Sequence, residues 1–352
     1  MITKDDVLSK INNDLVFQIH NMLDLKSDEK YKISNITATS TAYIINIVKQ
    51  NTDRIEYFIK TSRKNAESDL EKRLGRREVD FYNFINKQNL KVYPNIPKCF
   101  KCFSTKDKYD YYIVLEDLSK KYLNAEKINF CNKEHWKYAV NALANFHMLF
   151  WNNIPDSYLK LNQGSLNEIE RDNIKLYNSF IKFAEYCSIR LNNDAYKIIK
   201  HSIPIEKKIA IEQYRRYQNK ENLTIVHGDA HNNNFLYPKS KKKCAYIIDW
   251  QFWDFGIGTY DLRHLLGLGL NNRMRKYQKE LVEYYYEIIT RRKDLNYSWD
   301  ECWRDYKLGI IDNLFMPIWQ YVGFHWEYDR WKETLKNVID NYIELECDRI
   351  SI

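Results

Sequence analysis

The chain has 352 residues and a formal net charge of +8; 44% of its residues are hydrophobic and 29% are charged. This composition excludes a disordered chain, and the length suits two domains or two lobes. No apolar run is long enough to cross a membrane, the first residues lack the apolar stretch of a secretion signal, and the seven cysteines do not follow the spacing of a disulfide framework, so we expect a soluble, cytoplasmic protein.

The first third of the sequence alternates between helical and strand patterns. Apolar residues spaced along one helical face predict a helix over residues 4–25, and a charged, breaker-poor stretch predicts another over 64–88. β-branched and aromatic runs predict two strand pairs, one from 43–48 and 55–59 and one from 98–104 and 109–115. The second pair begins near Cys99 and Cys102, a C-x-x-C without the second pair of a zinc site.

The remainder is mostly helical. Helical spacing extends over 135–151, 166–188 and 192–218 and from about 261 to the end, whereas short strand patterns interrupt it at 223–226, 234–237 and 245–248. Trp and Tyr residues at helical spacing after 299 indicate core packing or, alternatively, the lining of a substrate pocket. We therefore predict an α+β protein of two lobes, a strand-rich lobe over 1–116 and a mainly helical lobe over 117–352.

Two carboxylates and an amide mark the short strands inside the helical part. Asp229 follows the strand that ends at Val226, Asn234 comes five residues later, and Asp249 ends the strand Ala245-Tyr-Ile-Ile. Asp-x-x-x-x-Asn followed by a strand-borne Asp is the spacing of the protein-kinase catalytic loop and metal aspartate. Carboxylate and amide oxygens are ligands that Mg²⁺ prefers. The pattern predicts Asp229 as the base that accepts the proton of an attacking hydroxyl, with Asn234 and Asp249 as Mg²⁺ ligands.

A wider resemblance follows from these residues. The string His-Gly-Asp-Ala-His-Asn-Asn-Asn over 227–234, with Ile-Asp-Trp over 248–250, resembles the H-G-D-x-H-x-x-N and I-D-W motifs of the aminoglycoside phosphotransferase and choline kinase superfamily. Val-Leu-Glu-Asp-Leu over 114–118, Leu-Ala-Asn-Phe-His over 143–147 and Asp-Trp-Gln over 249–251 are similar to motifs of its ecdysteroid kinase-like (CHK kinase-like) branch. The resemblance covers about residues 30 to 265.

The resemblance implies a two-lobed protein-kinase-like fold, with a nucleotide-binding lobe over 1–116 and a catalytic and substrate-binding lobe over 117–352. It also implies an ATP- and Mg²⁺-dependent phosphotransferase. The γ-phosphoryl group would pass to a hydroxyl of a small molecule such as an aminoglycoside, a choline-like amine or another alcohol. It further implies that Lys60 binds the α- and β-phosphates and pairs with Glu78, although Lys49 and Lys64 lie near Lys60 in the sequence. Leu115, Glu116 and Asp117 would form the hinge beside adenine.

The sequence also allows alternative functions. The absence of glycine from 36–43, where a phosphate-covering loop is expected, supports a non-catalytic nucleotide sensor or scaffold. No segment running from D-F-G to A-P-E follows Asp249, which argues against a protein kinase. Charges of both signs are interspersed along the helices, which indicates a solvated surface rather than a partner that is a nucleic acid or a membrane. His147, His227 and His231 are expected to be structural, and Asp261 to cap its helix or brace the catalytic loop.

Overall fold

The computed structural model describes residues 31–38, 42–49, 56–62, 69–88, 90, 93–105, 111–129, 132–155, 166–187, 193–240, 244–292, 294–323 and 325–350. The helix expected over 4–25, the turn at 51–53 and residues 39–41 of the expected phosphate loop lie outside them. The chain forms two compact units: one extends to Lys127 and includes Phe235–Trp253, and the other comprises Ile128–Asn234 and Asp254–Ile352.

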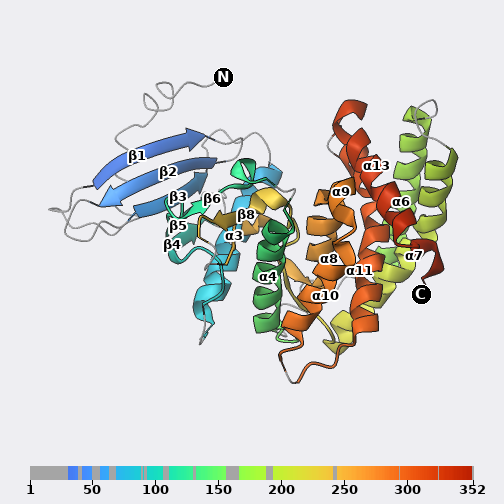
Figure 1. Cartoon of the computed structure of the whole chain (residues 1–352). Helices are drawn as coiled ribbons and strands as arrows, with labels where there is room; N and C mark the ends of the chain where they lie inside the picture. The colour runs from blue at the N-terminus through green and yellow to red at the C-terminus, as the bar shows by residue number, and fades with distance from the viewer. Residues whose placement is uncertain are drawn as a thin grey trace. The chain divides into compact units, whose positions relative to one another are not determined.

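The first unit is built on a five-stranded antiparallel sheet. Its strands are β1 (Tyr31–Ala38), β2 (Ala42–Lys49), β3 (Glu56–Ser62), β4 (Cys99–Ser104) and β5 (Tyr111–Glu116). They lie in the order β1-β2-β3-β5-β4, which places β3 in the middle (Figure 1). Both strand pairs expected from the sequence, β2 with β3 and β4 with β5, are therefore present, and β3 joins them by pairing with β5.

Helix α3 (Asp69–Lys87) packs against β4 and β5. Val79, Phe81, Tyr82 and Ile85 are buried, as expected for the apolar face of an amphipathic helix. Gly75 allows a close approach, because a side chain there would collide with the ring of Tyr111. Helix α3 therefore packs closely against the sheet at this position.

The rest of the first unit is a small sheet and two turns. Strands β6 (Tyr122–Leu123), β8 (Phe235–Pro238) and β9 (Tyr246–Ile247) pair in the order β6-β8-β9, and Phe235 lies opposite Ile247. The single 3₁₀ turns η1 (Ala125–Lys127) and η3 (Trp250–Phe252) follow β6 and β9.

The second unit is mainly helical. Its helices are α4 (Lys133–Phe150), α6 (Leu166–Tyr186), α7 (Asn193–Asn219), α8 (Thr259–Leu262), η4 (Arg263–Leu268), α9 (Asn272–Arg275), α10 (Gln278–Ile289), α11 (Trp299–Asn313), α12 (Met316–Val322) and α13 (Tyr328–Glu344). Short turns η2 (Asn232–Asn234) and η5 (Cys347–Arg349) and the strand pair β7 (Thr224–Val226) and β10 (Asp254–Gly256) complete it. The mixed α+β class and the helix-rich second part agree with the prediction.

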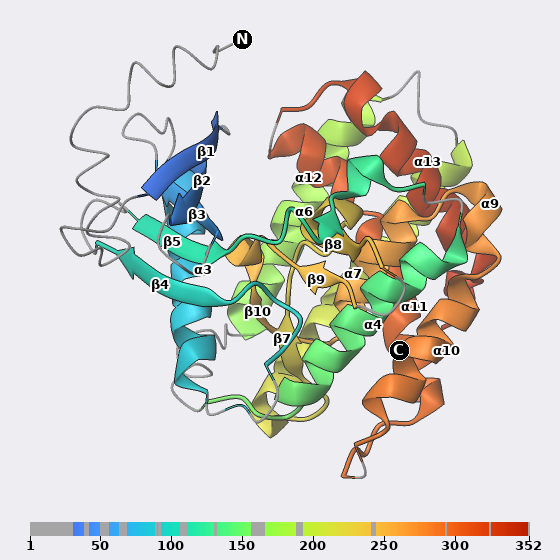
Figure 2. The ribbon, with the colours of Figure 1, turned by 60° about the vertical axis from the view of Figure 1, so that its left-hand side comes forward.

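Two packed groups of helices form the core of the second unit. Helix α4 packs along α10 (Figure 2), and the buried residues of the two helices include Leu143, Phe146, Leu281 and Ile288. A second cluster joins α6, α7, α12 and α13 around the buried Trp331. The C-terminal aromatic residues are thus partly core residues, as their spacing indicates, although Trp319 is exposed.

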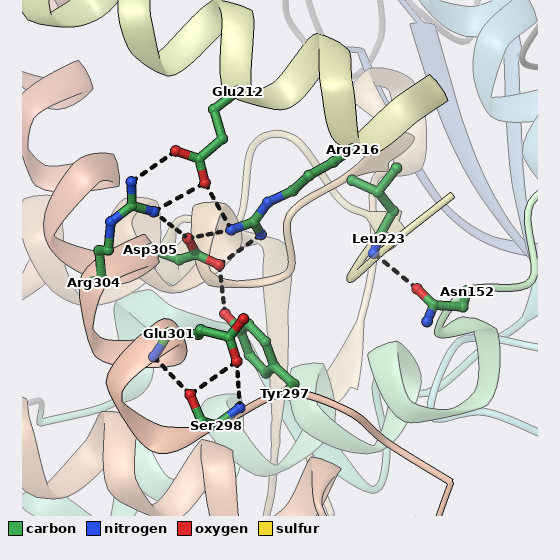
Figure 3. A network of polar contacts seen from close by, with 9 residues as sticks. All are labelled: Asn152, Glu212, Arg216, Leu223, Tyr297, Ser298, Glu301, Arg304 and Asp305. Carbon is green, nitrogen blue, oxygen red and sulfur yellow. Dashed lines mark hydrogen bonds and ion pairs between the residues drawn. The ribbon is translucent and has the colours of Figure 1, made fainter. Parts of the chain in front are cut away.

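A polar network links α7 with α11 inside this unit. The fully buried carboxylate of Asp305 accepts two hydrogen bonds from Arg216, at 2.7 and 2.8 Å, and one from Tyr297 Oη at 2.7 Å (Figure 3). Glu212 adds a bidentate ion pair with Arg304 at 2.8 and 2.9 Å.

Within the described residues, no helix combines the length and apolar character needed to cross a membrane.

Candidate active site

Lys60 forms an ion-pair cluster with two carboxylates of the first unit. Its Nζ lies 2.6 Å from Glu78 Oε2 and 2.6 Å from Asp249 Oδ1. The Glu78 side chain is 2% exposed and that of Lys60 14%, whereas that of Asp249 is 33% exposed. Burial alone would lower the pKa of Lys60, but the two carboxylates outweigh burial and raise it. The ammonium therefore stays charged at neutral pH.

Each member of this cluster comes from a different element. Lys60 lies in β3, paired on one side with Ile44 and on the other with Ile113. Glu78 lies near the middle of α3, and Asp249 follows the last residue of β9 by two positions. A central strand and a packed helix have little backbone freedom, so the charges of Lys60 and Glu78 are held at a fixed place.

Asp249 adopts an unusual backbone conformation. Its φ of 66° and ψ of 61° lie in the left-handed region, which disfavours residues other than glycine. The next residue, Trp250, is fully buried and stacks on Phe81 of α3, with ring centroids 4.1 Å apart. Trp253 Nε1 also donates to Arg77 O at 2.8 Å. These contacts to α3 hold a strained aspartate in place, and such strain is typical of functional sites.

The residues expected to form a catalytic loop lie in the second unit, after β7. Asn234 Nδ2 donates to Asp229 O at 2.7 Å and lies 3.4 Å from Asp229 Oδ2. His231 Nε2 lies 3.5 Å from the same oxygen, whereas His264 Nε2 lies 3.4 Å from Oδ1. Burial alone would raise the pKa of Asp229, but the hydrogen bond from His231 and the nearby imidazoles outweigh burial and lower it. Asp229 is therefore an ionised, oriented carboxylate at neutral pH.

Asp261 braces the beginning of this loop. Its carboxylate accepts hydrogen bonds from the backbone N–H of His227 at 2.6 Å and of Gly228 at 3.0 Å. His147 Nε2 lies 3.1 Å from the same carboxylate, and its Nδ1 lies 2.8 Å from Tyr285 Oη. His227 in turn accepts the Asp229 N–H through Nδ1 at 3.2 Å. The bracing role of Asp261 and the structural roles of His147 and His227 agree with the expectations from the sequence.

Comparison with known proteins identifies the family of this chain. The sequence model of the ecdysteroid kinase-like family matches residues 32–297. The chain belongs to the ecdysteroid kinase-like family. This is a family of kinase-like small-molecule phosphotransferases. No curated protein sequence matches the chain significantly.

Solved structures of kinases share the fold of this ecdysteroid kinase-like protein. A Ralstonia eutropha protein assigned to the aminoglycoside phosphotransferases superposes with a TM-score of 0.58 at 10% identity, covering 94% of this chain and 96% of that one. An amicoumacin kinase in complex with AMP-PNP, Ca²⁺ and Ami gives a TM-score of 0.53 at 10% identity, with coverage of 97% and 96%. The APH(2")-IIa complex with streptomycin and ATP gives 0.50 at 14% identity, with coverage of 92% and 96%. At these identities the likeness concerns the fold.

The site residues expected from the sequence fall into both units. The structure brings Lys60, Glu78 and Asp249 together in the first unit, and Asp229 and Asn234 together in the second. The expected hinge, Leu115 to Asp117, ends β5 and continues beyond it. The N–H of Glu116 donates to Lys98 O, and Asp117 Oδ1 accepts the N–H of Ser119 at 2.8 Å. Adenine recognition by this hinge therefore stays a prediction, and it could not use the Glu116 N–H.

Two features were not found by reasoning from the sequence. One is His264 beside Asp229, whose only signal is its place three residues after Asp261. The other is the tripeptide Asp254-Phe255-Gly256, which matches the kinase D-F-G by letter. It forms β10, paired with β7, and Asp254 Oδ1 accepts the N–H of Phe255 at 2.7 Å. This local use of Asp254 leaves Asp249 as the better candidate for a metal ligand.

The candidate metal ligands have suitable chemistry. No group of three or more His, Cys, Asp or Glu side chains poised to hold a metal occurs in the described parts of the chain. A Mg²⁺ site does not require such a group, because Mg²⁺ is usually bound by one or two protein oxygens together with substrate phosphates and water. Asn234 Nδ2 donates to Asp229 O at 2.7 Å, so the amide oxygen of Asn234 points away from that carbonyl. A carboxylate at Asp249 and an amide oxygen at Asn234 are hard ligands of this kind.

Proposed function

We propose that this ecdysteroid kinase-like protein transfers the γ-phosphoryl group of ATP to a hydroxyl group of a small molecule. The observation that carries the proposal is the cluster of Lys60 with Glu78 and Asp249, both at 2.6 Å. A charged, immobilised lysine in a central strand is the phosphate-binding element of kinase-like enzymes. Glu78 would hold that lysine in place, and the lysine would act on the α- and β-phosphates as a point charge.

The charge of the cluster supports a metal-nucleotide ligand. Lys60 contributes one positive charge against the carboxylates of Glu78 and Asp249, which leaves an excess of one negative charge. The partly exposed Asp249 can meet a divalent cation, whereas the buried Glu78 cannot. Asp249 would help to hold Mg²⁺, whose charge would offset the negative charge that develops on the phosphates. We propose that Asp249 and Asn234 are the ligands of the Mg²⁺. Asn234 directly precedes Phe235 of β8, and Asp249 lies two residues after Ile247 of β9. Phe235 and Ile247 pair with each other in the small sheet.

Asp229 would orient the acceptor hydroxyl and accept its proton. The carboxylate is ionised because its pKa lies below the usual range, and Asn234 and His264 each contact one of its two oxygens. Phosphoryl transfer does not require a strongly basic carboxylate, because the transition state of the transfer is loose and catalysis comes mainly from positioning. An oriented carboxylate of low pKa therefore suffices.

An assay of phosphoryl transfer tests the proposed function. The purified protein is incubated with Mg-ATP and a panel of amino alcohols, aminoglycosides, sugars and steroid alcohols, and mass spectrometry follows the gain of one phosphoryl group. We expect a phosphorylated product with the wild type and with Asp329→Asn, a variant of an exposed residue, and none with Asp229→Asn. Binding of Mg-ATP without transfer to any member of a broad panel would favour a nucleotide sensor and overturn the proposal.

A further inference from the structure

The helix formed by α8 and η4 contacts three consecutive residues of the catalytic loop. Asp261 accepts hydrogen bonds from the N–H groups of His227 and Gly228. His264, three residues later, lies with Nε2 3.4 Å from Oδ1 of Asp229. Residues three apart on a helix lie on the same side, so one helical face meets the loop twice. The second contact is made with the side chain proposed as the base.

His264 lies in a π-helical segment, Arg263–Leu268. A π-helical turn is wider than an α-helical turn, occurs rarely and is frequent at functional sites. Here Asn313, which is 1% exposed, holds the turn: its Nδ2 donates to Arg263 O at 3.0 Å and its Oδ1 accepts from the Arg263 guanidinium at 3.0 Å. Gly309 leaves room for Arg263, because a Cβ there would lie 2.6 Å from Arg263 Cδ. The residue directly before His264 is therefore held by contacts to α11.

The two oxygens of Asp229 have different neighbours. Oδ2 lies near Asn234 Nδ2 and His231 Nε2, at 3.4 and 3.5 Å, whereas His264 is the neighbour of Oδ1. An ionised carboxylate only accepts hydrogen bonds, so the favourable tautomer of His264 carries its proton on Nε2. The separation of 3.4 Å is longer than a good hydrogen bond, as is common for catalytic contacts before substrate binds.

The imidazole of His264 beside Asp229 is uncharged at neutral pH. Burial lowers its pKa to about 4, an effect that the carboxylate of Asp229 opposes without reversing it. A cationic histidine would form a strong ion pair with Asp229 and make it a poorer proton acceptor. A neutral imidazole instead offers one directed N–H and fixes the plane of the carboxylate at little cost in basicity.

We propose that His264 is a positioning residue that orients the carboxylate of Asp229 toward the acceptor hydroxyl. The inference rests on the proposed function, because it assumes that Asp229 receives the proton. His264 would not need to touch the substrate, and its action through Asp229 would appear in turnover rather than in nucleotide binding.

Three substitutions test this role. Gln can place an N–H donor near the position of Nε2, Asn is too short to do so, and Ala has no donor. We expect His264→Ala and His264→Asn to lower kcat about 30- to 100-fold and His264→Gln by less than about fivefold, since small misplacement of a catalytic group has effects of this size. The dissociation constant of Mg-ATP should stay within about twofold in all three. His201→Ala, on an exposed histidine of α7, serves as the matched control.

Crystal structures of the same variants supply a readout that does not need turnover. The Asp229 carboxylate should keep its orientation in His264→Gln and rotate in His264→Ala. An unchanged kcat, or an equal loss in all three variants, would overturn the positioning role, as would an unmoved carboxylate in His264→Ala. If the wild type phosphorylates no acceptor, the proposed function fails, while the carboxylate orientation still decides whether His264 positions Asp229.

Discussion

The indole of Trp250 lies flat on the phenyl ring of Phe81, with centroids 4.1 Å apart and planes inclined by 5°. Phe81 is three residues after Glu78 on α3, and Trp250 directly follows Asp249. The stack thus joins the two segments that carry the carboxylates of the Lys60 cluster. The backbone of Trp250 also hydrogen-bonds Glu78, which reinforces this link.

Replacing Trp250 should therefore affect both stability and nucleotide binding. Trp250→Ala should lower the free energy of unfolding by about 3–5 kcal/mol, as for other large-to-small changes in a core. Because Asp249 would lose the contact that holds its left-handed backbone, we also expect weaker Mg-ATP binding. Urea unfolding and titration calorimetry measure the two effects. Trp319→Ala removes an exposed indole and should change neither; equal effects of both variants would contradict this account.

Asp229 and Asp249 should be separable by their effects. Asp229→Ala should reduce kcat by about 10²- to 10⁴-fold, the usual contribution of a general base, with little change in Mg-ATP affinity. Asp249→Ala should weaken Mg-dependent ATP binding itself while leaving metal-free ATP binding nearly unchanged. Comparing ATP titrations with and without Mg²⁺ provides the measurement. Metal-dependent affinity that survives in Asp249→Ala would remove this residue from the ligand set.

His264 should make the protein sensitive to mild acid. Its folded-state pKa of about 4 lies below the ordinary histidine value of 6.5. As pH falls through this window the unfolded chain binds the proton first, so the folded state loses stability, by up to about 3 kcal/mol from this group. His264→Gln should therefore lose less unfolding free energy than the wild type between pH 7 and pH 4. Urea unfolding at several pH values measures this difference. An equal fall in the free energy of unfolding of the two proteins between pH 7 and pH 4 would contradict the prediction.

The buried Asp305 should be important for the stability of the second unit (Figure 3). Asp305→Ala would leave Arg216, which is 12% exposed, without its bidentate partner. Breaking a buried pair from one side costs about 3–5 kcal/mol, and urea unfolding should register a loss of this size. Asp329→Ala breaks an exposed pair with Lys332 and should cost less than about 1 kcal/mol. Similar losses for the two variants would show that Glu212, 3.0 Å from the Arg216 guanidinium, compensates for the lost carboxylate.

Sequence patterns predicted the local chemistry better than the tertiary contacts. The β-branched and aromatic run before Lys60 and the charged, breaker-poor stretch around Glu78 identified their elements, and the family resemblance implied that the two would pair. The contact of Lys60 with Asp249 was not foreseen, because it joins residues 189 positions apart. His264 was missed for a related reason: a π-helical turn follows from the packing of Arg263 against Gly309 and Asn313, which no local pattern reveals.

The segment Phe235–Trp253 belongs to the first unit although the chain on both sides of it belongs to the second. No single cut in the polypeptide can therefore release the two units as intact pieces. A fragment ending at Lys127 would lack two strands of the small sheet, the ring that covers Phe81 and one of the two carboxylates that surround Lys60. The first unit is complete only after the ribosome has also produced Ile128–Asn234 of the second unit, so a product that ends before Asp249 should lack part of the proposed phosphate site.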